Sequence, residues 1–89
     1  MNLRQLAHLT ALAEQGSFSR AAERLHLTQS ALSRSLQTLE DELGARLIDR
    51  AGKRSTLTPL GEAVLARARR ITLEAAEIQR SAELLRQGE

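Results

Sequence analysis

The chain has 89 residues, which suffice for one domain with a modest hydrophobic core. Its apolar content of 42% favours a folded protein, and the lack of cysteine excludes disulfides and thiolate metal sites. The net charge of +2 indicates no partner by itself. Twelve of the thirteen basic residues are arginine, which suits phosphate and guanine recognition, although genome composition alone would produce the same bias.

Several functional classes are excluded by the residues that the chain lacks. No apolar run approaches the roughly 20 residues of a membrane span, and no signal-peptide pattern opens the chain, so we expect a cytoplasmic protein that contacts no membrane. His8 and His26 are too few and too isolated to indicate a metal site. Without paired carboxylates in a plausible cleft, a cysteine nucleophile or a glycine-rich phosphate loop, we expect no enzyme and no cofactor.

The first two helices are predicted in the N-terminal quarter. Over residues 2–15, apolar side chains recur at helical rather than alternating spacing. Gly16 is expected to end this helix, because glycine readily adopts the left-handed conformation. A short second helix then follows through about Leu25, with Ser17 or Ser19 as its N-cap.

A third helix is predicted from Gln29 to about Leu43, with Thr28 as its N-cap and Gly44 as its end. Its narrow apolar stripe consists of Leu32, Leu36, Leu39 and Leu43. A helix, a short break and a second helix between residues 19 and 43 match the spacing of a helix-turn-helix. The fold is therefore expected to be mainly α.

Residues 46–58 predict a two-stranded hairpin, because two short, partly β-branched runs flank the turn sequence AGK. Arg50, Lys53 and Arg54 gather around its tip. A basic hairpin after a helix-turn-helix is typical of a winged helix-turn-helix, whose wing can follow a phosphate backbone or enter a minor groove.

A long helix is predicted over residues 59–87, beginning with Thr58 as N-cap and Pro59 at the first helical position. Large and small apolar residues alternate along it in a heptad pattern. We call this set the heptad seam, and it comprises Val64, Ala68, Ile71, Ala75, Ile78, Ala82 and Leu85. The seam predicts a homodimer through this helix, because 29 residues would overhang so small a body. The alternative is that the stripe packs on its own domain.

The outward face of the helix 29–43 carries little charge in its first two turns. Gln29, Ser30, Ser33, Arg34 and Gln37 present amide, hydroxyl and guanidinium groups, whereas the acidic residues cluster at the far end. Such groups can pair with base edges in a major groove, and a helix N-terminus also favours phosphate. Alternatively these are ordinary solvated residues, in a protein whose long helix binds a partner and whose front domain only stabilises it.

In this order, the segments SFSRAAERL, TQSALSR and RSTLTPLGEAVL resemble the N-terminal DNA-binding domain of LysR-type transcriptional regulators. The resemblance covers nearly the whole chain. Ser30 stands where many family members have proline, and Ile48 where phenylalanine is frequent.

The resemblance implies a winged helix-turn-helix at 1–58 and a linker or dimerisation helix at 59–89, with helix 29–43 in the major groove. It implies sequence-specific binding of double-stranded DNA at a partly palindromic operator, near the nucleoid. Base-edge and nearby contacts fall on Gln29, Ser30, Ser33 and Arg34. Backbone or minor-groove contacts fall on Thr28, Arg50, Lys53 and Arg54. The chain then represents the DNA-binding module, and a small-molecule inducer would act only through the family's C-terminal effector domain, which is absent here.

Overall fold

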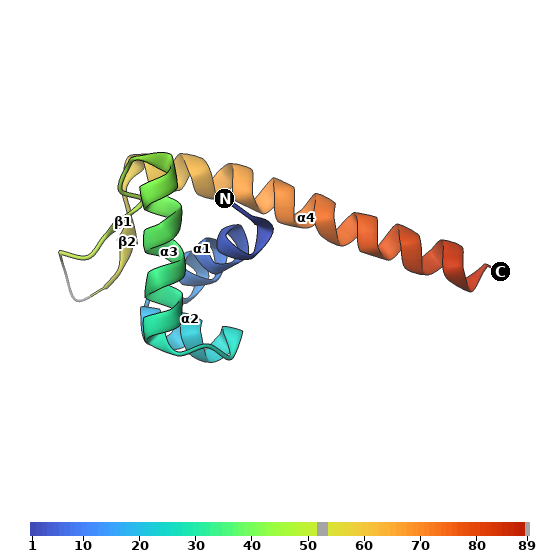
Figure 1. The fold of residues 1–89 in the computed structure, drawn as a ribbon, viewed down its shortest axis with the longest axis horizontal. Helices are drawn as coiled ribbons and strands as arrows, with labels where there is room; N and C mark the ends of the chain where they lie inside the picture. The colour runs from blue at the N-terminus through green and yellow to red at the C-terminus, as the bar shows by residue number, and fades with distance from the viewer. Residues whose placement is uncertain (52–53, 89) are drawn as a thin grey trace.

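The computed structural model describes residues 1–51 and 54–88. Its elements in chain order are α1 (Leu3–Gln15), α2 (Phe18–Leu25), α3 (Gln29–Leu43), β1 (Ile48–Asp49), β2 (Thr56–Leu57) and α4 (Pro59–Gln87). Figure 1 shows α1, α2 and α3 gathered at one end of the molecule, with α4 running away from them to the C-terminus. The predicted winged helix-turn-helix followed by a long helix is confirmed.

Local capping explains where each helix of the winged domain begins. Asn2 caps α1 in a capping box with Gln5, each side chain accepting from the other residue's amide. Ser17, rather than Ser19, caps α2 by accepting from the amide of Arg20 at 3.1 Å. Gly16 and Gly44 end α1 and α3 as predicted, with φ angles of 74° and 68°.

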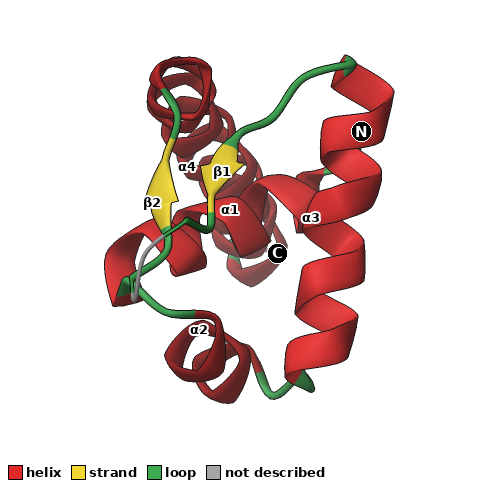
Figure 2. Cartoon of the chain, turned by 90° about the vertical axis from the view of Figure 1, so that its left-hand side faces the viewer, coloured by secondary structure: helices red, strands yellow, loops and turns green. Residues whose placement is uncertain are grey.

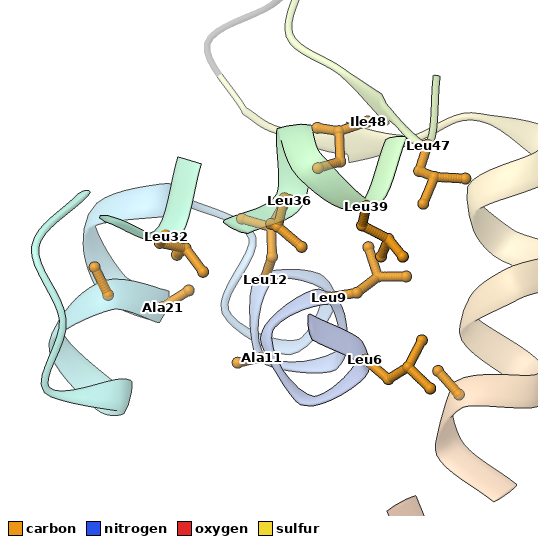
Figure 3. Close-up of a cluster of buried hydrophobic side chains, with 12 residues drawn as sticks. Leu6, Leu9, Ala11, Leu12, Ala21, Leu32, Leu36, Leu39, Leu47 and Ile48 are labelled. Atoms are coloured by element: carbon orange, nitrogen blue, oxygen red, sulfur yellow. The ribbon is translucent and has the colours of Figure 1, made fainter. Parts of the chain in front are cut away.

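The core lies where α1, α3 and the start of the wing meet (Figure 3). Its largest fully buried side chains are Leu9, Leu12, Leu32, Leu36, Leu39, Leu47 and Ile48. Ala21 and Ala22 are also buried, which lets α2 approach its neighbours closely. Two residues of the predicted stripes lie outside the core, because Leu3 and Leu43 sit at helix ends and are exposed.

The wing is shorter than the two runs that the sequence suggested. β1 and β2 pair antiparallel, with Ile48 opposite Leu57 and Asp49 opposite Thr56. The amides of Leu47 and Ile48 donate to the carboxylate of Glu40 on α3. A side chain of α3 therefore anchors the start of the wing. Figure 2 shows β1 and β2 side by side, with α3 to one side of them.

The first turns of α4 belong to the domain, and the rest extends beyond it. Leu65 and Ala68 are buried and Val64 packs against the core, whereas almost every residue after Thr72 is exposed. The molecule measures 53 Å along its longest axis and 25 Å and 19 Å along the others. The long axis follows α4 (Figure 1).

Candidate nucleic-acid interface

The N-terminus of α3 forms the centre of the candidate interface. Thr28 has extended backbone and its hydroxyl oxygen accepts from the amide of Ala31 at 3.0 Å. Its own hydroxyl proton remains able to donate to an outside acceptor. The first turn of α3 contains no acidic residue, so nothing opposes the partial positive charge of the helix end.

The side chains predicted to read bases lie together on this end of α3. Gln29, Ser30 and Arg34 are exposed and Ser33 is half-buried. Gln37 is also exposed, but it lies a turn further along and lines a different hollow, with Asp41 and Arg46 among its neighbours. The first two turns therefore offer hydroxyl, amide and guanidinium donors within one surface.

The wing reaches this surface through Arg50. The Cζ atom of Arg50 lies 4.9 Å from the centre of the Phe18 ring, which is a cation–π distance. One shallow pocket joins three parts of the fold, and its lining is Phe18, Gln29, Ser30, Ser33, Arg34 and Arg50. The structure thus brings Arg50 beside the predicted base-reading residues.

Arg54 lies near the turn between α1 and α2. A Cβ atom built on Gly16 would lie 3.7 Å from Nη2 of Arg54. Arg54 is exposed, as its predicted role requires. Lys53, predicted as a third wing contact, lies outside the described residues.

These cations keep their charge available. Among residues 1–51 and 54–88, the ion pairs join Met1 to Glu42, Arg80 to Glu77 and Arg86 to Glu83. None of these pairs involves Arg34, Arg50 or Arg54.

The acidic end of α3 is occupied by contacts within the chain. Glu40 is buried beneath the wing. The carboxylate of Glu42 accepts from the amino group of Met1 and from the side-chain amide Nε2 of Gln5, and these contacts hold the pKa of its carboxyl below its ordinary value. Both carboxylates therefore help to hold the fold rather than face a ligand at the other end of the helix.

The two histidines have structural positions. Nδ1 of His8 lies 2.7 Å from Oγ of Ser35, and burial, followed by the charge of Arg4, lowers the pKa of the ring. His26 ends α2 with a φ of 58°, in the predicted turn. Within the part of the chain that the structure describes, no group of three His, Asp or Glu residues is arranged to hold a metal ion.

The heptad seam is divided by the fold. Val64 packs against the core and Ala68 is completely buried in it, so these two positions match the alternative in which the stripe packs on its own domain. Ile71, Ile78 and Leu85 are 41%, 70% and 76% exposed. An apolar hollow beside them is lined by Leu3, Arg70, Ile71, Glu74, Ala75 and Ile78. Only the part of the seam from Ile71 onward offers an open face.

Three residues that shape this region were not singled out from the sequence. Phe18 is the only aromatic residue of the chain, which could have marked it as a partner for an arginine. Glu40 follows Leu36 by four positions, so its place on the buried stripe was a readable signal. Gly61 is tightly packed against Leu47, and the sequence gives no sign of that contact.

In the described ranges 1–51 and 54–88, no helix combines the length and apolar character that a membrane crossing requires.

Comparison with known proteins agrees with this geometry. Residues 3–62 match the sequence-family model described as bacterial regulatory helix-turn-helix protein, lysR family. The SDS degradation transcriptional activation protein of a Pseudomonas strain is 56% identical over 70 residues, which are 79% of this chain and 23% of that protein. The chain thus spans about a quarter of the length of this relative.

Solved structures extend the likeness to the whole chain. BenM_DBD in complex with catB site 1 DNA has a TM-score of 0.95 at 31% identity, with both chains fully covered. CbnR_DBD in complex with DNA has a TM-score of 0.82 at 42% identity, covering 99% of this chain and 98% of that one. The family model matches residues 3–62, and the fold of the whole chain matches that of BenM_DBD. The chain therefore belongs to the lysR family of bacterial regulatory helix-turn-helix proteins and carries its DNA-binding domain.

Proposed function

We propose that this chain binds double-stranded DNA at a specific, partly palindromic operator as a homodimer, and so serves as the DNA-binding module of a transcriptional regulator. The observation that carries the proposal is the surface at the start of α3, where uncharged donors and Arg34 adjoin Arg50 of the wing. Two relatives of the same fold, BenM_DBD and CbnR_DBD, were solved with DNA.

The first turns of α3 are suited to base edges in a major groove. Gln29 can pair with adenine, Arg34 can donate bidentately to guanine, and Ser30 and Ser33 can contact several bases. The small, uncharged side chains of Ser30 and Ser33 allow the backbone of α3 to approach the bases closely. Gln37, one turn further along, would meet the edge of the same groove.

The remaining polar groups are suited to the DNA backbone. Thr28 and the free amides of the α3 N-terminus can donate to a phosphate. Arg50 and Arg54, together with Lys53, can follow the neighbouring phosphates or enter the minor groove. These contacts would fix the register of α3 on the duplex without selecting a sequence.

The exposed seam of α4 supports a homodimer. Ile71, Ala75, Ile78, Ala82 and Leu85 line one side of a helix that extends far beyond its own domain. An apolar stripe of this length gains stability by pairing with a second copy. A twofold axis through α4 would repeat the recognition surface, which is why the operator is expected to be partly palindromic.

The action of the whole regulator is a further part of this proposal. The family resemblance implies a C-terminal effector domain that binds a small-molecule inducer, and α4 would connect the DNA-binding domain to it. Binding to chromosomal DNA would put the protein at the nucleoid in the cytoplasm.

Binding to duplexes selected from a random pool, measured over a range of salt concentrations, tests the proposal. The logarithm of the binding constant should fall linearly with the logarithm of salt, because each phosphate contact releases counterions. Arg34→Ala should cost about 1–3 kcal/mol on the selected site and less on random DNA. Arg80→Ala, an exposed arginine far along α4, is the matched control and should cost little. A salt slope near zero would contradict the proposal, and an equal loss on both DNAs would reduce Arg34 to a phosphate contact.

A further inference from the structure

We infer that Phe18 is a positioning residue for DNA binding, because its ring holds the guanidinium of Arg50 beside the start of α3 before DNA arrives. This inference rests on the proposed function and adds to it a residue that contacts no base or phosphate itself. The contact joins the first residue of α2 to the residue that follows β1.

The ring is a fixed platform. Phe18 is half-buried and packs against the core, and the N-cap at Ser17 sets the direction in which α2 begins. Phe18 is the only Phe, Trp or Tyr residue of the chain. A cation over the face of such a ring is attracted by its negative π surface.

Arg50 has no competing partner among the ion pairs of residues 1–51 and 54–88. Asp49, its neighbour in sequence, uses Oδ1 to accept from the amide of Ala51 at 2.9 Å. Among the residues that the structure describes, the contact with Phe18 is therefore the interaction that orients the Arg50 head group. An unrestrained arginine loses much rotamer freedom on binding, and a restrained one loses less.

The contact with Phe18 places the Arg50 guanidinium where it can take part in DNA binding. Phe18 and Arg50 line the same shallow pocket as Gln29, Ser30, Ser33 and Arg34. The cation is thus held next to the base-reading side chains, where a phosphate or a minor-groove edge would meet it. A wing arginine without this restraint would sample many positions along its hairpin.

A double-mutant cycle between Phe18 and Arg50 tests the inference. Phe18→Leu keeps an apolar side chain but removes the π face, and should weaken specific binding about 3- to 10-fold. Phe18→Tyr keeps the ring and should restore binding to near the original value. Arg50→Ala should weaken binding more, and Phe18→Leu should then cause no additional loss, since the ring acts through Arg50.

Leu25→Val is the matched control for a general loss of packing in α2. It lies on the same helix and packs against the core, but it does not line the pocket that Phe18 and Arg50 share. Its effect on binding should be the same whether Arg50 is present or replaced. An equal loss from Phe18→Leu in both backgrounds would mean that Phe18 acts through folding alone, and this would overturn the inference.

The free protein gives an independent measurement. The ring current of Phe18 should shift the NMR signals of the Arg50 side chain, and Phe18→Leu should return them to ordinary values. Unshifted signals would overturn the inference while leaving the proposed function intact. Absence of any salt-dependent DNA binding by the unaltered protein would overturn the proposed function and the inference together, even with shifted signals.

Discussion

The carboxylate of Glu40 on α3 accepts hydrogen bonds from the amides of Leu47 and Ile48, at 2.8 Å and 3.2 Å. All three residues are buried, so these amides have no access to water as an alternative partner. One side chain thus joins the end of α3 to the start of the wing. The relative position of α3 and the wing depends on this side chain.

Glu40→Ala should lower the free energy of unfolding by about 2–4 kcal/mol, because it leaves two buried donors unsatisfied. Glu40→Gln keeps one acceptor oxygen and should cost about 1 kcal/mol. Urea denaturation measures both. Asp41→Ala, at the next and exposed position, serves as the control and should change stability little. Equal losses for Glu40→Ala and Asp41→Ala would show that the buried acceptor is unimportant.

Gly61→Ala should destabilise the protein by about 3 kcal/mol through overpacking. A Cβ atom at Gly61 would lie 2.1 Å from the carbonyl oxygen of Leu47, which is backbone and cannot rotate away. Helix propensity alone predicts the opposite, a gain of about 1 kcal/mol. Thermal unfolding decides between them. The control is Ala63→Gly in the same turn, which is exposed and should lose about 1 kcal/mol by propensity. A gain from Gly61→Ala would show that the two segments can separate at little cost.

Stability should fall as the pH is lowered below about 6.5, the ordinary pKa of histidine. Burial and Arg4 lower the pKa of His8 in the folded protein, so the unfolded chain binds a proton more readily. The contribution of neutral His8 is therefore complete above the unfolded pKa and is lost as pH falls through the folded pKa. Urea midpoints between about pH 5 and pH 7.5 measure the effect. His8→Gln, which keeps a polar group near Ser35, should reduce this pH dependence, and an unchanged profile would contradict the assignment.

Ile78→Glu should raise the dissociation constant of the proposed dimer more than about 100-fold, because it replaces apolar burial with a desolvated charge. Ile78 is 70% exposed, so the fold of the single chain should be unaffected. Sedimentation equilibrium measures the association. Leu73→Glu is the matched control, since Leu73 is 63% exposed on the same helix but lies off the heptad seam. If both variants remain dimeric, or if both dissociate equally, the seam is not the interface.

The sequence was sufficient to predict the helices, because strong local signals mark their ends. Asn2, Ser17 and Thr28 supply caps, and Gly16 and Gly44 supply stops. The exposed face at the start of α3 was also predictable, since it follows from helical periodicity once the leucine stripe is assigned to the core. Local pattern and tertiary packing agree here.

Features that join distant segments were not predictable in this way. The contact between Phe18 and Arg50 spans two elements, and the sequence does not indicate which of the twelve arginines lies over the ring. Glu40 belongs to the acidic cluster at the far end of the predicted helix, and the sequence pattern did not show that this carboxylate is buried under the wing. Ala68 fits the heptad as well as Ala75 does, but α1 lies alongside the first turns of α4 and covers Ala68. The heptad pattern shows which side chains lie on one face of the helix, but it does not show whether the same chain or a second copy buries them.

The division of α4 gives its two halves different thermodynamic characters. The turns around Leu65 and Ala68 melt only when the whole domain does, because their side chains form part of its core. The turns beyond Thr72 are stabilised mainly by the hydrogen bonds within the helix, because almost all of their side chains are exposed. An isolated helical segment of that length has only marginal stability in water. In a solitary chain the far half of α4 therefore frays from its C-terminal end, and its amide protons exchange quickly with solvent. Pairing with a second copy, as proposed, would make order in that half rise with protein concentration.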